Sequence, residues 1–138
     1  MRNKNLYPIL SAIMVLVIIS LACSSLNPTP GASDFYMASD VDGTNKTNIF
    51  SPDQDFFVFF KVAGIEAGTA FQARWYGLDI ADVDPNVPFQ TIDYPYEEGI
   101  TKIYFQLTSD VPWPVGSYKV EVYMNGAKVG EQGFAVQE

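Results

Sequence analysis

Cys23 is the only thiol in the 138-residue chain, and its position is the clearest chemical signal in the sequence. It directly follows an apolar run over residues 6–22, and Arg2 and Lys4 precede that run with positive charge. A single thiol cannot form a disulfide within the chain, so packing alone is expected to stabilise the fold. The thiol is open to acylation, or it is an incidental cysteine at an apolar end.

A basic start followed by an apolar run is the layout of a secretory signal peptide. With Ala22 directly before Cys23, the segment resembles the lipobox of bacterial lipoproteins. The resemblance implies cleavage before Cys23, a lipid on its thiol, and an extracytoplasmic protein anchored to a bacterial membrane. Ser20 and Leu21 depart from the family's usual pattern. An uncleaved helix and a soluble secreted product therefore remain alternatives.

The next segment, residues 24–33, reads SSLNPTPGAS and carries no charge. Such a composition cannot bury a core and is typical of a flexible tether. Ten residues span roughly 33 Å when extended. The expected organisation is a lipoprotein signal peptide at 1–22, a lipidated Cys23 with a tether at 23–33, and one domain at 34–138.

Charge excludes several partners. Without residues 1–22 the chain keeps 116 residues, with six basic and sixteen acidic side chains and a formal charge of −10. A negative surface repels nucleic acid and anionic lipid headgroups. The sequence therefore predicts no nucleic-acid partner and no charge-driven membrane binding, while a basic protein partner or a cation stays open.

Apolar and polar residues alternate through most of the domain, which predicts strands with one buried face. The expected strands are 34–39, 56–62, 69–78, 100–108 and 117–124, with a short edge strand near 89–94 inside the Pro-rich segment 80–99. Asn125-Gly126 predicts a two-residue hairpin that pairs Met124 with Ala127. Phe134 and Val136 then have the wrong parity, so a β-bulge is expected between Gly130 and Gly133.

The stretch from Trp113 to Val122, the Asn125-Gly126 turn and the segment 134–136 resemble the end of a bacterial immunoglobulin-like domain. In that family a tyrosine entering the penultimate strand forms a corner against the preceding turn, and Tyr118 matches it. Trp75 matches the buried tryptophan of the third strand. The resemblance implies an all-β, antiparallel immunoglobulin or fibronectin-like sandwich of about seven strands after the signal helix. Another sandwich or a jelly roll is the alternative.

Aromatic side chains on the outer faces of the sheets are the main candidates for binding. The alternation places Phe57, Phe59 and Tyr104 on one outer face and Tyr76 and Tyr123 on the other. Trp113 lies between two prolines in a rigid turn, where it either anchors a partner or plugs the end of the sandwich. Outward rings stack on sugars or dock proteins. Because Phe57 and Phe59 are too apolar to stay bare, we also expect something to lie over them.

Metal and enzyme chemistry have weaker support. Asp40 and Asp42, with Asn45 and Asn48, form an oxygen-rich loop, and a second acidic group contains Asp79, Asp82 and Asp84. Each group either binds Ca²⁺ weakly or only accepts hydrogen bonds from the backbone of its own turn. The chain has no histidine and no phosphate-binding glycine loop, so the sequence predicts no enzyme and no cofactor.

Taken together, the sequence predicts a non-catalytic, membrane-anchored lipoprotein that acts as an interaction or structural module of the cell envelope with a protein partner. One alternative is a carbohydrate or small-ligand binder that uses the outward aromatics and the loop at 80–99. Another is a calcium-stabilised adhesion module.

Overall fold

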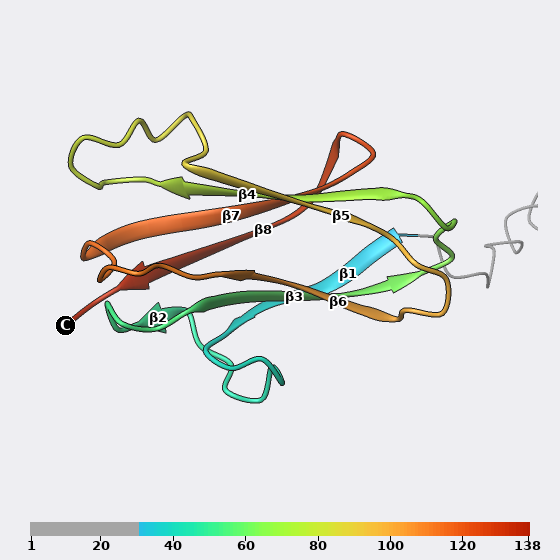
Figure 1. Cartoon of the computed structure of the whole chain (residues 1–138), viewed down its shortest axis with the longest axis horizontal. Helices are drawn as coiled ribbons and strands as arrows, with labels where there is room; N and C mark the ends of the chain where they lie inside the picture. Colours follow the sequence, from blue (N-terminus) through green and yellow to red (C-terminus); the bar gives the residue numbers. More distant parts are fainter. Residues whose placement is uncertain (1–30) are drawn as a thin grey trace, which may run out of the picture.

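Alternating apolar residues build two β-sheets that pack face to face (Figure 1). The computed structural model describes residues 31–138, so the expected signal helix and Cys23 lie outside the described residues. Strands β1, β3 and β6 form one sheet, and β2, β8, β7, β4 and β5 form the other, each in that order. The strands are β1 Gly31–Ala38, β2 Ile49–Phe50, β3 Phe56–Ala63, β4 Ala70–Gly77, β5 Gln90–Pro95, β6 Lys102–Leu107, β7 Gly116–Met124 and β8 Ala127–Val136.

Most of the core consists of the inward side chains predicted from the alternation. Trp75 of β4 and Phe60 of β3 are completely buried, and the remaining core residues are less than a tenth exposed. The core includes Phe56, Val58, Val62, Phe71, Ala73, Ile103, Phe105, Leu107, Tyr118, Val120, Val122, Phe134 and Val136. Burial of this apolar surface is the main force that holds the sheets together. The all-β sandwich expected from the sequence is confirmed.

Strand β2 is an element that the sequence did not predict. It has two residues and pairs in parallel with β8, through Ile49 with Ala135 and Phe50 with Val136. Every other ladder between named strands is antiparallel. A two-residue strand is too short to show a period, and packing rather than propensity holds it: the Phe50 ring lies 4.9 Å from Phe56. The described domain therefore has eight strands rather than about seven.

The β7–β8 hairpin follows the prediction at its turn and departs from it at the bulge. Met124 pairs with Ala127, and Asn125 and Gly126 both have positive φ, as the two-residue turn requires. The register then shifts between Lys128 and Gly130, because Val122 pairs with Gly130 and Tyr123 with Lys128. The extra residue is Val129, so the bulge lies before Gly130 and the expected position between Gly130 and Gly133 is wrong.

Strand β1 begins earlier than the sequence suggested. Its ladder with β3 starts at Gly31 and Ala63, three residues before the expected start at Asp34. The register shifts between Ser33 and Tyr36, where Asp34 has a φ of 56°. The sequence placed three small residues of this segment in the tether: Gly31, Ala32 and Ser33. They join the sheet through their backbone, because strand pairing needs no side chain.

Tyr118 forms the corner implied by the immunoglobulin-like resemblance. Its hydroxyl donates a hydrogen bond to the backbone carbonyl of Pro114, with 2.6 Å between the oxygens. Burial, assisted by the nearby Asp79 carboxylate, raises the pKa of Tyr118 above its usual value and so keeps the hydroxyl protonated. The bond ties the 108–115 turn to the start of β7.

We expect Tyr118→Phe to lower the free energy of unfolding by about 1 kcal/mol, because the Pro114 carbonyl loses its donor. Chemical denaturation measures the change. Tyr104→Phe is the matched control, since Tyr104 is 46% exposed and its hydroxyl has water as an alternative partner. Equal stability of wild type and Tyr118→Phe would show that the corner bond is not stabilising.

Candidate interaction surfaces

The outer face of the three-stranded sheet carries a second, small aromatic cluster. Phe57 and Phe59 of β3 point outward as expected, but they are only 4% and 2% exposed and pack with Tyr36 and Ala38. The loop over residues 39–48 covers them, and Gly43 approaches so closely that an added Cβ would stand 3.0 Å from the Phe59 ring. The expectation that something covers these rings is met, and they are not open for binding.

Cations complete the cover on this face. The ammonium of Lys46 lies 4.2 Å from the centre of the Tyr36 ring, and that of Lys102 lies 4.7 Å from the Phe59 ring. Such contacts stabilise a ring and a cation together. Tyr104 packs at the edge of the cluster, 5.3 Å from Phe59, and is the one candidate ring here that remains widely exposed.

The rings on the outer face of the five-stranded sheet are also covered. Tyr76 is 7% exposed, and the ammonium of Lys119 lies 4.8 Å from its ring centre. The Arg74 guanidinium stacks on Tyr123 at 3.9 Å. Neither Tyr76 nor Tyr123 therefore presents an open ring face of the kind that stacks on a sugar.

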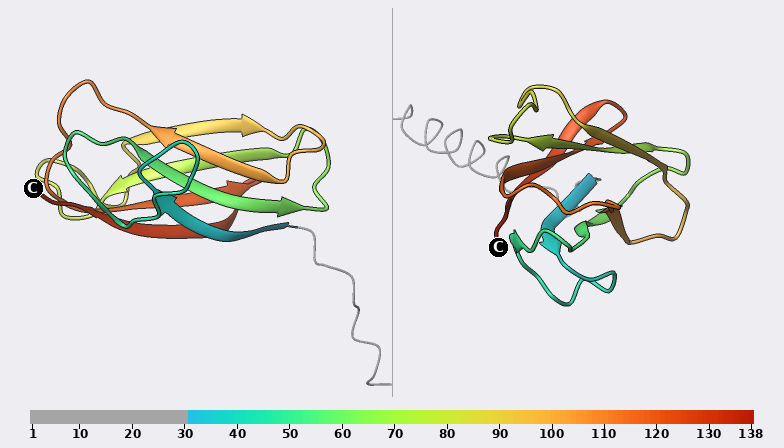
Figure 2. Two further views of the ribbon diagram at one scale, coloured as in Figure 1. Left: turned by 90° about the horizontal axis from the view of Figure 1, so that it is seen from below. Right: turned by 60° about the vertical axis from the view of Figure 1, so that its left-hand side comes forward.

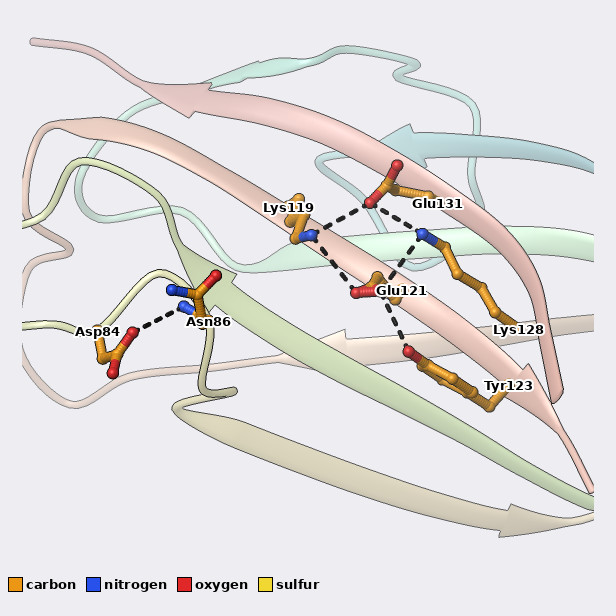
Figure 3. A network of polar contacts seen from close by, with 7 residues as sticks. All are labelled: Asp84, Asn86, Lys119, Glu121, Tyr123, Lys128 and Glu131. Atoms are coloured by element: carbon orange, nitrogen blue, oxygen red, sulfur yellow. Dashed lines mark hydrogen bonds and ion pairs between the residues drawn. The ribbon is translucent and has the colours of Figure 1, made fainter. Parts of the chain in front are cut away.

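Glu121 is the only charged side chain counted as buried in residues 31–138, and it organises the polar network on this face (Figure 3). Its carboxylate lies 3.4 Å from the ammonium groups of both Lys119 and Lys128 and accepts a hydrogen bond from the Tyr123 hydroxyl. Glu131 contacts the same two lysines. Sequence reasoning missed this network, because its members come from two strands whose register depends on the bulge at Val129.

Burial is the largest single effect on the Glu121 carboxyl, and by itself it raises the pKa. The charges of Lys119 and Lys128 and the Tyr123 hydroxyl together outweigh it, so the pKa of Glu121 falls below its usual 4.5. A lowered folded-state pKa stabilises the fold at pH values above 4.5. This contribution is lost as the pH falls through the folded-state pKa.

The other candidate surface is an open pit at one end of the sandwich. It has a volume of about 170 Å³ and an entirely apolar surface. Its walls come from the end of β4, the 78–89 loop, the 108–115 turn and β7. The lining residues are Gly77, Ile80, Val83, Phe89, Trp113, Pro114 and Tyr118. The pit therefore joins residues as far apart in the sequence as Gly77 and Tyr118.

Trp113 is both a plug of the sandwich and a wall of this pit. Its ring stacks on Phe56 at 4.8 Å, and its indole N–H donates a hydrogen bond to the Gln54 carbonyl. Its backbone N–H donates to the Pro52 carbonyl. Phe89 packs against the same ring at 6.2 Å and is 38% exposed. Because core contacts fix Trp113, the pit is formed before anything binds.

The pit lies at the end of the sandwich opposite the start of β1. The described chain begins at Gly31, which pairs with Ala63 at one end, while Gly77 and the C-terminal strand end lie at the other (Figures 1 and 2). The eight residues of β1 span roughly 26 Å between these ends. We call the pit-bearing end the distal end; it comprises residues 51–55, 78–89, 108–116 and 137–138.

The candidate metal loop uses its oxygens internally. The Asp40 carboxylate accepts hydrogen bonds from the Thr44 hydroxyl and from the backbone N–H groups of Thr44 and Asn45. The Thr44 hydroxyl, followed by these backbone donors, lowers the pKa of Asp40. Asp42 lies exposed in the same turn. Within residues 31–138 no three acidic, cysteine or histidine side chains gather as metal ligands.

Comparison with known proteins identifies the fold. No protein-family model and no curated protein matches the sequence. Among solved structures, the chain is similar to an immunoglobulin-like protein from Pseudomonas aeruginosa, with a TM-score of 0.56 and 11% sequence identity over 80% of this chain and all of the other. The domain is an immunoglobulin-like β-sandwich, as the Tyr118 and Trp75 pattern implied. An identity of 11% supports a shared fold only, so any function must be argued from the surfaces of this domain.

Within residues 31–138 no helix has the length and hydrophobicity needed to cross a membrane.

We expect Phe59→Ser to lower the free energy of unfolding by about 3 kcal/mol, because it empties a buried aromatic site under the 39–48 loop. Thermal or chemical denaturation measures the loss. Tyr104→Ser, which removes an exposed ring from the same cluster, should cost less than about 1 kcal/mol. Equal losses in the two variants would show that Phe59 is not the covered member of the pair.

We expect Glu121→Gln to lower the free energy of unfolding by about 1 kcal/mol at pH 7, because both lysines lose their shared anion. The difference from wild type should shrink as the pH falls from 5 to 3, since protonation then removes the same charge from wild type. Urea denaturation across this pH range measures it. Glu97→Gln, outside the network, is the control, and a gap that widens towards low pH would contradict the assigned pKa direction.

Proposed function

We propose that this protein is an extracytoplasmic lipoprotein, anchored through a lipid on Cys23, whose immunoglobulin-like domain is a non-catalytic interaction module of the cell envelope. The lipobox-like segment ending at Cys23 supports the anchor. The structural observation that best supports the proposal is the separation between the end of the sandwich where β1 starts and the distal end. The chain joins the sandwich at Gly31, and the preformed apolar pit lies at the distal end.

This separation suits an anchored binding module. Seven residues separate Cys23 from Gly31, and a chain of that length reaches at most about 25 Å. An anchor at Cys23 therefore keeps the Gly31 end near the membrane and leaves the distal end free to face away from it. A pit formed by rigid core side chains loses little conformational entropy when a partner binds.

The alternative functions draw less support from the same surfaces. Phe57, Phe59 and Tyr76 are buried, so these rings are not open to a sugar. The Asp40 carboxylate is occupied by its own loop. The distal pit has neither carboxylate nor nucleophile in its lining, which favours binding over catalysis.

We expect the protein extracted from bacterial membranes with detergent to begin at Cys23 and to carry added acyl mass. Intact-mass measurement and N-terminal fragmentation establish both features. Cys23→Ser is the matched variant, because it replaces only the thiol sulfur with oxygen, and it should carry no acyl mass. A mature protein that begins at Met1, or that bears no acyl group at Cys23, would refute the anchor.

A further inference from the structure

Exposed apolar side chains are concentrated at the distal end. Eight large hydrophobic residues in the described chain are well exposed, and five of them belong to the distal loops. These five are Leu78, Val87, Phe89, Val111 and Val115. Val111 is 68% exposed, the largest value of the eight. Apolar surface gathered around an apolar pit is a signature of a binding site rather than of random exposure.

The same end is strongly acidic. The segments that make up the distal end contain seven carboxylate side chains and no lysine or arginine. The carboxylates are Asp53, Asp55, Asp79, Asp82, Asp84, Asp110 and Glu138. Asp79 and Asp84 accept hydrogen bonds from nearby backbone N–H groups, whereas Asp82 and Asp110 are exposed in the loops. The apolar pit therefore lies at an end of the sandwich whose charged side chains are all negative.

The basic residues of the domain are held elsewhere. All six lie on the outer faces of the sheets or in the 39–48 loop, where they contact rings or carboxylates. Lys61, for example, pairs with Asp34, and Arg74 stacks on Tyr123. No basic residue of the distal segments offsets their negative potential, so a cationic partner is attracted to this end in particular.

We propose that the distal end binds a segment of a partner protein that inserts one aromatic or branched aliphatic side chain into the pit and places lysine or arginine beside it. The proposal deepens the interaction function proposed above by giving the partner's chemistry. An apolar cavity of roughly 150 Å³ holds a benzene-sized group, so a pit of about 170 Å³ suits one such side chain. The surrounding carboxylates suit the flanking cations.

The extent of the apolar surface favours a protein segment over a free small molecule. Val87, Val111 and Val115 are exposed in the distal loops but do not line the pit, so apolar surface continues beyond what one ring covers. An inserted side chain carried on a protein buries this additional surface, and the anchoring side chain in its pocket then supplies much of the binding free energy.

The test uses the full chain in a neutral detergent, with empty micelles as the blank. The probe is a ten-residue glycine–serine peptide with Lys-Phe-Lys at its centre, without tryptophan or tyrosine. Two matched peptides replace the phenylalanine with alanine or both lysines with glutamate. Trp113 fluorescence reports occupancy, because Trp113 lines the pit while Trp75 is completely buried.

We expect the Lys-Phe-Lys peptide to bind about tenfold more tightly than either matched peptide, and to weaken severalfold when salt rises from about 50 to 500 mM. Phe89→Ala should weaken binding about tenfold, since it removes a wall of the pit. Asp82→Asn with Asp110→Asn should weaken it severalfold. Glu97→Gln with Glu98→Gln removes the same charge from the opposite end and should leave binding unchanged.

Equal affinities for the three peptides, or no fluorescence change with any of them, would overturn the proposal. So would phenethylammonium binding as tightly as the peptide, because the pit would then be a small-molecule site. These results are independent of lipidation at Cys23. An unlipidated protein that still selects the Lys-Phe-Lys peptide would refute the anchor alone, and a lipidated protein without this selectivity would refute the partner chemistry alone.

Discussion

Aromatic packing around Phe56 is the constraint on which the rest of the domain depends. Residues 31–138 contain no cysteine, so no disulfide joins the two sheets, and side-chain packing must do so. The Phe56 ring lies between the sheets and contacts five other rings, with centroid distances from 4.7 to 6.4 Å: Phe50, Trp75, Trp113, Tyr118 and Phe134. Two of these, Trp113 and Tyr118, also line the distal pit. The interaction that closes the sandwich therefore also fixes the geometry of its candidate binding site.

The sheet faces and the distal end differ in their charged residues: the basic side chains lie on the faces and in the 39–48 loop, whereas the distal segments carry only acidic ones. On the sheet faces each aromatic cluster is covered by a cation, as Lys102 covers Phe59 and Arg74 covers Tyr123. These covered rings offer little bare apolar surface to a partner, and Tyr104 is the candidate ring on these faces that remains widely exposed. At the distal end, apolar and acidic side chains remain uncovered. The distal end is therefore the part of the described domain where most of its exposed large apolar side chains gather.

Alternation along single strands was sufficient to predict most of the fold. It identified the inner faces of β3, β4, β6 and β7, because each of these strands has one buried and one outer face. It placed Phe57 and Phe59 on the outer face and called for a cover, but it did not identify that cover. The cover comes from a loop that approaches closely at Gly43 and is held by the hydrogen bonds of Asp40. Nor did the alternation locate the pit, which unites Ile80 and Phe89 with Trp113 from a distant turn. Two sequence signals pointed there, the proline-flanked Trp113 and the 80–99 loop, but nothing in the sequence showed that they meet.

The direction of β1 has a mechanical consequence. Strand β1 starts at Gly31, at the end opposite the pit, and pairs along its length with β3. A force applied between an anchor before Gly31 and a partner held at the distal end acts parallel to these strands. The backbone hydrogen bonds of an antiparallel ladder lie perpendicular to the strands, so such a load shears them together rather than opening them one at a time. Bonds that share a load resist rupture better than bonds that meet it in turn, so the β1–β3 ladder is oriented to resist a pull along this axis.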